Sequence, residues 1–179
     1  MYMNFGKSIG ILSLLGCMAL PLPAYALMQG LSTEKLTHDA ALIVMGDVED
    51  VASQWSADKK SITTTAVVSV QQAMKGKLEQ KKVRVMNMGG QVGDIVMRQS
   101  DVAPLHKGER VLLFLSSEEQ VSGGAARGIQ GRGQGIYTIG NDRIARKQGF
   151  SVDAAYGQID STIPLEILTE KIRSYVDEQ

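Results

Sequence analysis

Cysteine and histidine are both scarce in this sequence. The 179-residue chain has one Cys, Cys17, and two His, His38 and His106. Disulfide scaffolds and thiolate metal sites need several Cys, which excludes both classes. Neither His has a second His at the spacing of a metal-binding motif. The sequence therefore predicts no metal or cofactor, although it leaves open a zinc site built from both histidines.

Aromatic residues and an excess of charge are also missing. Phe, Trp and Tyr make up 5% of the chain, and 19 Lys and Arg balance 19 Asp and Glu. Nucleic-acid-binding domains are usually basic and stack bases on aromatic rings, so no nucleic acid partner is expected. There is no Gly-x-Ser-x-Gly motif, and the Gly-rich run Gly131–Gly135 does not open a helix as a dinucleotide-binding loop would.

The only long hydrophobic run lies at the N-terminus. Lys7 precedes the apolar stretch Ile9–Leu20, and Ala24 and Ala26 follow at the positions that signal peptidases require to be small. We therefore interpret residues 1–26 as a cleaved secretory signal. The protein is then exported to the periplasm, the cell surface or the medium, with no transmembrane span after cleavage.

Lipoprotein processing at Cys17 is the alternative to this cleavage. The segment Leu14–Cys17 resembles a lipobox, which would make Cys17 the lipidated N-terminus of a lipoprotein. The better Ala-x-Ala site at Ala26 favours simple cleavage. That cut removes 26 residues and one basic group, leaving 153 residues with 18 basic and 19 acidic side chains and no Cys.

Alternating hydrophobicity predicts a mostly β domain over residues 27–179. Two strands, Ala41–Val51 and Ile62–Val70, flank a polar turn and form a hairpin, and Val83–Met86 forms a third strand. Residues 91–106 show no clear period and suggest an irregular strand.

The second half of the domain continues this pattern. The unbroken apolar run Arg110–Leu115 predicts a strand buried on both faces. The polar, Gly-rich stretch Ser116–Gln134 predicts a mobile loop. Ile136–Ile139 and Arg143–Lys147 predict a second hairpin.

Each end of the domain is expected to form a helix. Ser32 can cap a short helix that ends near Ala40. Pro164 is a favourable first residue for an amphipathic helix over 164–177, whose apolar stripe should pack on the sheet.

A family resemblance emerges from short motifs over about residues 32–147. Lys-Gly and Gly-Glu turns precede strands, and the order of motifs is Gly46-Asp47-Val48, Ile62-Thr63-Thr64, Met74-Lys75-Gly76, Gly89-Gly90 and Lys107-Gly108-Glu109. This order resembles a group of exported bacterial proteins of unassigned function. It is also similar, more distantly, to the netrin-like module of the tissue inhibitors of metalloproteinases. The resemblance implies an OB-like small β-barrel of about five to seven strands.

The resemblance does not carry protease inhibition with it. Those inhibitors present a disulfide-tethered N-terminal Cys to the protease zinc, whereas this chain would begin at Leu27 without any Cys. An untethered terminus must lose conformational entropy on binding. A protease-inhibitor-like module is therefore a minor alternative.

Two basic, Gly-containing segments are the candidate binding surface. The segments are residues 75–82 and 123–135, which could share one rim of the barrel. Trp55, the only Trp in the sequence, is added to this surface. The candidate residues are Lys75, Lys77, Lys81, Lys82, Arg127, Arg132 and Trp55. They favour an exported, non-enzymatic binding or interaction module for a protein or an anionic envelope component. Ordinary solvated turns would give the same pattern. An envelope hydrolase using His38 or His106 is the alternative function.

Overall fold

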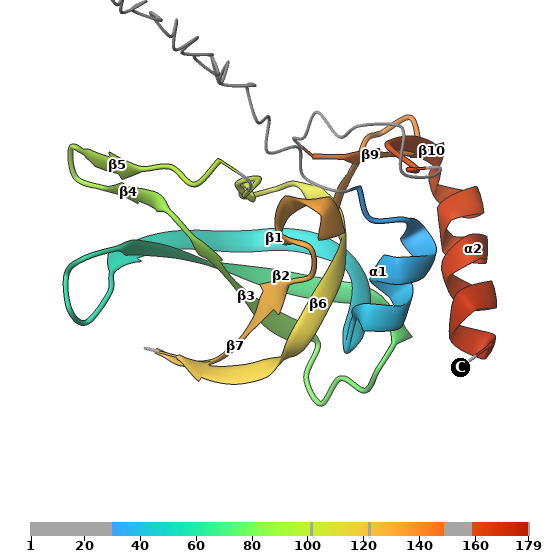
Figure 1. The fold of residues 1–179 in the computed structure, drawn as a ribbon, viewed down its shortest axis with the longest axis horizontal. Helices are drawn as coiled ribbons and strands as arrows, with labels where there is room; N and C mark the ends of the chain where they lie inside the picture. Colours follow the sequence, from blue (N-terminus) through green and yellow to red (C-terminus); the bar gives the residue numbers. More distant parts are fainter. Residues whose placement is uncertain (1–29, 101, 122, 149–158, 179) are drawn as a thin grey trace, which may run out of the picture.

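The computed structural model describes residues 30–100, 102–121, 123–148 and 159–178 (Figure 1). The predicted signal, with Cys17, Ala24 and Ala26, lies outside these residues. In chain order the elements are α1 (Thr33–Asp39), β1 (Leu42–Trp55), β2 (Ile62–Lys75), β3 (Lys82–Met88), β4 (Gly90–Val92), β5 (Ile95–Met97), β6 (Arg110–Val121), β7 (Gly124–Ile129), η1 (Arg132–Gly135), β8 (Ile136–Ile139), β9 (Ile144–Lys147), β10 (Thr162–Pro164) and α2 (Leu165–Asp177).

Five strands form a ring in the order β1-β2-β3-β7-β6, and β6 returns to pair with β1. All of these pairings are antiparallel except β3 with β7, which run parallel and meet at the single residue pair Val85 and Arg127. Beyond the ring, β8, β9 and β10 extend the sheet from β6, while β4 and β5 form a separate two-stranded sheet. The predicted mostly β fold with a short helix near the N-terminus and a C-terminal helix is confirmed, and five of its strands form a ring.

Where β1 and β6 pair with each other, both faces of the sheet are buried. Leu42 and Val44 of β1 and Leu113 of β6 point into the ring, where they join one hydrophobic cluster. Ile43 and Phe114 point outward and join a second cluster with the helices. This alternation confirms the prediction of a strand buried on both sides, because each side chain in the apolar run finds a core.

The two helices cover the outer face of the sheet and lie side by side (Figure 1). Ser32 caps α1 as expected, its side chain accepting a hydrogen bond from the backbone N–H of Lys35 at 3.1 Å. Leu168 and Ile172 of α2 are fully buried in the outer cluster, which confirms that the stripe packs on the sheet. None of the helices in the described ranges is both long and apolar enough to cross a membrane.

The β1–β2 hairpin is longer than its predicted strands and projects beyond the ring as an arm (Figure 1). Near its base the register shifts between Met45 and Gly46. A Cβ atom on Gly46 would lie 2.1 Å from the carbonyl oxygen of Ser69. Glycine is therefore needed there so that the two backbones can approach.

The predicted mobile loop over Ser116–Gln134 is wrong. The strand β6 continues to Val121, and β7 pairs with it antiparallel, with Glu118 opposite Arg127. The residues are polar because much of this hairpin faces solvent. Pairing with the neighbouring strand stabilises it, although the sequence shows no hydrophobic alternation there. The ambiguous region 91–106 contains the short hairpin β4–β5.

Candidate functional site

Two of the predicted basic residues are engaged in holding the fold together. The Nζ atom of Lys75 donates to the carbonyl oxygens of Thr37 at 2.7 Å and His38 at 3.1 Å, at the C-terminal end of α1. Lys82 Nζ lies 2.5 Å from the carboxylate of Glu49. The hydrogen bond from Lys82 lowers the pKa of Glu49 below its usual value.

The other basic residues do not gather in one place. Lys77 and Lys81 are exposed on the β2–β3 loop. The side chain of Arg127 is only 16% exposed and donates to the Ser116 carbonyl. Arg132 lies in η1, whose preceding Gly131 packs against Leu31.

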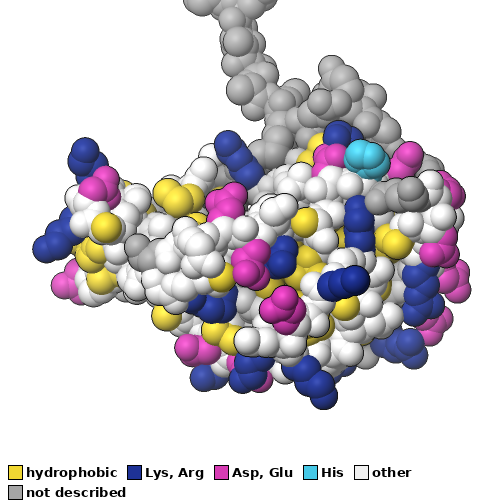
Figure 2. All heavy atoms as spheres, turned by 90° about the horizontal axis from the view of Figure 1, so that it is seen from below, with side chains coloured by type: hydrophobic (Ala, Val, Ile, Leu, Met, Phe, Trp, Pro, Cys, Tyr) yellow, Lys and Arg dark blue, Asp and Glu magenta, His cyan; other side chains and the backbone are white. Residues whose placement is uncertain are grey.

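The face that carries the β2–β3 loop is mixed in charge. Figure 2 shows Lys and Arg interleaved with Asp and Glu on the face seen from below. Arg84 of β3, two residues beyond the first predicted segment, donates to the Gly123 carbonyl in the second. Lys77, Lys81, Lys82 and Arg132 are thus the exposed charges of the predicted surface, and Lys82 is paired with Glu49. Trp55 is half-buried at the far end of β1, opposite Ile62.

A groove of about 670 Å³ lies between the β1–β2 arm and the β4–β5 hairpin. Its floor belongs to the ring core and includes Ala66, Val85 and Leu105. Its walls come from the arm, from residues 87–99 and from residues 102–106. The lining residues are Val51, Ser53, Thr64, Ala66, Val85, Asn87, Met88, Gly89, Gly90, Gln91, Val96, Met97, Arg98, Gln99, Val102, Pro104, Leu105 and His106.

Local hydrogen bonds fix the hairpin against the arm. The Gly89 N–H donates to the Ile62 carbonyl at 2.7 Å, and the Thr64 hydroxyl donates to the Gly89 carbonyl at 2.7 Å. Gly90 has φ of 134°, and a Cβ atom there would lie 2.2 Å from Thr64 Oγ1. The glycine pair therefore lets the chain cross closely over the arm, which creates one wall of the groove.

The groove is apolar with a scattering of polar groups. Met88 and Val96 line it with 46% and 51% of their surface exposed. The side-chain amides of Asn87, Gln91 and Gln99 also line it. Such a combination of apolar surface with a few hydrogen-bonding groups is typical of ligand-binding sites.

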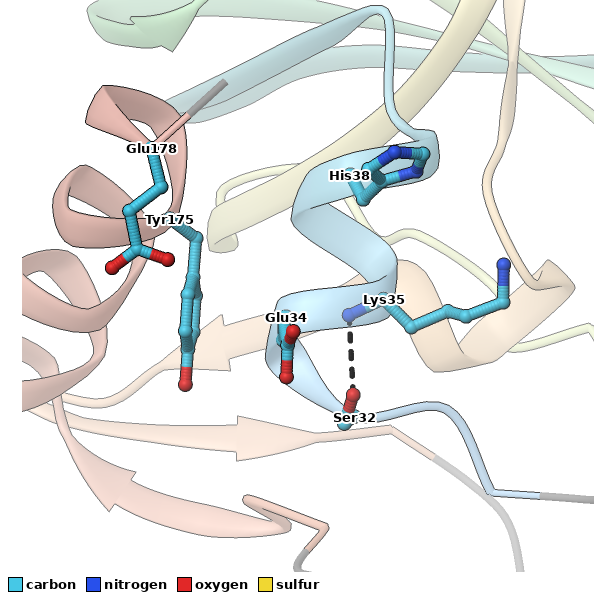
Figure 3. Close-up of a pocket in the computed structure, with 6 residues that line it drawn as sticks. All are labelled: Ser32, Glu34, Lys35, His38, Tyr175 and Glu178. Carbon is cyan, nitrogen blue, oxygen red and sulfur yellow. Dashed lines mark hydrogen bonds between the residues drawn. The ribbon is translucent and has the colours of Figure 1, made fainter.

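A second hollow of about 420 Å³ lies between α1 and α2 (Figure 3). It is lined by Ser32, Glu34, Lys35, His38, Tyr175 and Glu178. Lys35 and His38 both contact the carboxylate of Asp39, at 2.6 Å and 3.1 Å. Hydrogen bonds from Lys35 and then from His38 lower the pKa of Asp39. The charges of Lys35 and Asp39 therefore compensate each other on the protein itself.

The two histidines lie in different hollows. His38 lines the hollow between the helices, while His106 lines the groove beside the β4–β5 hairpin, and both are exposed. The structure therefore does not bring them together. Within the described ranges, no group of three or more His, Cys, Asp or Glu side chains is placed to hold a metal ion.

A third group of polar residues holds the start of the described chain. The Leu31 N–H donates to Gln134 Oε1 at 2.7 Å, and Lys147 Nζ donates to the Leu31 carbonyl at 3.0 Å. Burial lowers the pKa of Lys147 to about 8 and raises that of Tyr137, whose ring lies 5.4 Å from Lys147 Nζ, to about 12. Gln134 and Tyr137 are buried and Lys147 is half-buried, and their contacts hold Leu31 against the sheet.

Sequence reasoning missed the groove. Its residues come from the region 91–106, where no period was visible, and from the ends of two strands that were predicted too short. The available signal was Gly89-Gly90 followed by exposed apolar residues, including Ile95 and Val96. No protein-family model matches the chain, and no curated protein matches it in sequence.

Proposed function

We propose that the protein is an exported binding module of the cell envelope, and that a segment of a partner protein binds in the groove between the β1–β2 arm and the β4–β5 hairpin. The observation that carries this proposal is the partly exposed apolar surface of Met88 and Val96 beside the open groove. Monomeric proteins usually expose large apolar side chains singly, and a cluster of them next to a groove suits a partner.

Export, the cleaved signal and kinship with netrin-like modules remain part of this proposal. They rest on the N-terminal sequence and on the order of motifs given above. The five-strand ring agrees with an OB-like module but does not by itself distinguish among the many functions that such folds carry.

The groove supports binding better than hydrolysis. A hydrolytic site needs a nucleophile or activated water beside a base that a third group orients. His106 is the only titratable acid–base candidate among the described residues lining the groove, and its backbone N–H, not its ring, is hydrogen-bonded to Glu109. The alternative of a histidine-dependent hydrolase therefore has less support.

Site-specific photo-crosslinking in the native envelope tests the proposal. A photoreactive amino acid at Gln99, in the groove, should give one discrete crosslinked protein. The same probe at Glu170, on the exposed side of α2, is the matched control and should not give that product.

Two neutral variants link the product to the groove. The double variant M88S/V96S should suppress the Gln99 crosslink, whereas Ile167→Ser, which removes a similarly exposed apolar side chain from α2, should leave it unchanged. Equal crosslinking from Gln99 and Glu170, or a product that M88S/V96S does not alter, would overturn the proposal.

The same assay tests the basic surface. The variant K77S/K81S removes the accessible charges of the β2–β3 loop, which does not line the groove. If the partner binds through the groove, this variant should retain the crosslink. Its loss would transfer the binding role to the basic loop.

A further inference from the structure

We infer that the segment bound in the groove is an extended, apolar peptide that carries a carboxylate, and that Arg98 is the residue that binds this carboxylate. The inference rests on the proposed function, because it assigns a ligand class to the same groove. It depends on the charges, the amide groups and the size of the groove.

The charge of the groove differs from that of the whole chain. Acidic and basic residues are equal in number over the full sequence. Among the described residues that line the groove there is an Arg and a His but no Asp or Glu. The carboxylate of Glu109, which does not line the groove, accepts the backbone N–H of His106 at 3.0 Å. In the described part of the chain, no carboxylate pairs with the guanidinium of Arg98.

Arg98 is suited to bind a carboxylate. Its side chain is exposed and forms no hydrogen bond or ion pair with any residue in the described part of the chain. A guanidinium stays charged and presents paired N–H donors that match the two oxygens of a carboxylate. The ring nitrogens of His106 offer a second hydrogen-bonding group in the same groove.

The amide side chains favour a peptide over an acyl chain. An extended peptide carries one N–H and one C=O per residue that need partners, whereas a hydrocarbon chain has none. Asn87 and Gln91 each donate one bond, to the carbonyls of Ala103 at 3.5 Å and Gly93 at 3.0 Å. Their amide oxygens, and both groups of the Gln99 side chain, have no hydrogen-bond partner among the described residues and can bind a ligand.

The dimensions of the groove favour a short extended segment. Its volume of about 670 Å³ lies within the range of sites that take a drug-sized ligand or a few side chains. An α-helix is 10–12 Å wide with its side chains and would fill more than this hollow. An extended peptide can place alternate apolar side chains on Met88 and Val96 and keep its backbone near the amides.

A paired peptide library tests the inference on protein produced from the full sequence. Each octapeptide is made in two forms, one with Asp or Glu and one with Asn or Gln at the same positions, with both termini blocked. Binding of each pair is measured by fluorescence anisotropy. We expect the acidic form to bind about tenfold more tightly, as one charge-assisted hydrogen-bonded pair would give.

The variants separate Arg98 from general charge. Arg98→Gln should abolish the tenfold preference and leave binding of the neutral form unchanged, while Arg98→Lys should retain part of the preference. Arg173→Gln, which removes an exposed Arg from α2, is the matched control and should change neither. M88S/V96S should weaken both peptide forms.

The possible failures are distinguishable. If both peptide forms bind equally and M88S/V96S weakens both, the groove binds peptides without charge selection; the inference is then overturned and the proposed function stands. If Arg98→Gln leaves an acidic preference intact, Arg98 does not bind the carboxylate. If no peptide binds and the envelope crosslink is also absent, the proposed function fails.

Discussion

Apolar side chains are buried on the helix-covered face of the sheet and partly exposed in the groove beside the β4–β5 hairpin. On the covered face, Phe114 and Tyr137 are fully buried beneath α1 and α2. At the groove, Met88 and Val96 keep about half of their surface exposed. The sheet needs a second layer on each apolar surface, and in the described part of the chain only one of these surfaces has it. This difference is the basis of the proposal that a partner supplies the missing layer at the groove.

The largest expected effect is on the covered face. Phe114→Ala should lower the free energy of unfolding by about 3–5 kcal/mol, because it leaves a cavity in a closed core. Chemical denaturation with urea measures the change. A loss below 1 kcal/mol would mean that this face is not a tightly packed core, and the contrast with the groove would disappear.

A smaller effect is expected where the hairpin crosses the arm. Gly90→Ala should cost about 2 kcal/mol, because φ of 134° is strained for a residue with a Cβ atom and Thr64 blocks the added atom. Gly93→Ala is the control: its φ is 60° and nothing lies near the new Cβ, so about 1 kcal/mol is expected. Equal losses would show that the hairpin is not held closely against the arm.

Lys147, which donates to the Leu31 carbonyl, should make the free energy of unfolding depend on pH. Burial lowers the pKa of Lys147 from 10.5 to about 8, so the unfolded chain holds this proton over a range in which the folded protein has released it. Stability attributable to Lys147 should therefore rise between pH 8 and 10.5, by about 2 kcal/mol after allowance for partial exposure.

Comparison with Lys147→Met isolates the contribution of Lys147 to the pH dependence of the free energy of unfolding. Methionine keeps an apolar stem over Tyr137, so the difference between the two proteins should show the slope that Lys147 contributes. Measurements should stop near pH 10, because ionisation of Tyr137 in the unfolded chain would oppose folding above it; burial holds the pKa of the folded Tyr137 near 12. Parallel stability curves for the two proteins would contradict the assignment.

The smallest stability effect is expected in the groove itself. Val96→Ser should change the free energy of unfolding by no more than about 0.5 kcal/mol, since the side chain is 51% exposed. Thermal and urea denaturation would measure it. A loss of stability as large as that of Phe114→Ala would show that Val96 is a core residue. It would contradict the proposal that Val96 forms part of a binding surface.

Much of the fold was predictable because local pattern and tertiary environment agree. The run Arg110–Leu115 has apolar residues at every position after Arg110, which fits a strand between two cores. The helix after Pro164 shows its period clearly, and Leu168 and Ile172 are buried as expected. In such segments, burial alone determines both the structure and the sequence pattern.

The site was harder to predict because its parts meet only through long-range pairing. The strand β7 is Gly-rich and has weak strand propensity, yet it pairs with both β6 and β3. The groove joins residues near 51, 64, 88 and 105, and no local pattern relates these positions. The basic residues were visible in sequence, but their charge partners, such as Glu49 for Lys82, were not.

The strand β6 also determines how the molecule must unfold. Leu113 belongs to the cluster inside the ring and its neighbour Phe114 to the cluster under the helices. Neither cluster can lose this strand without exposing the other to water, so the two should melt in one cooperative transition, despite their separate positions. A damaging substitution on either side of β6 would then be felt by the entire domain.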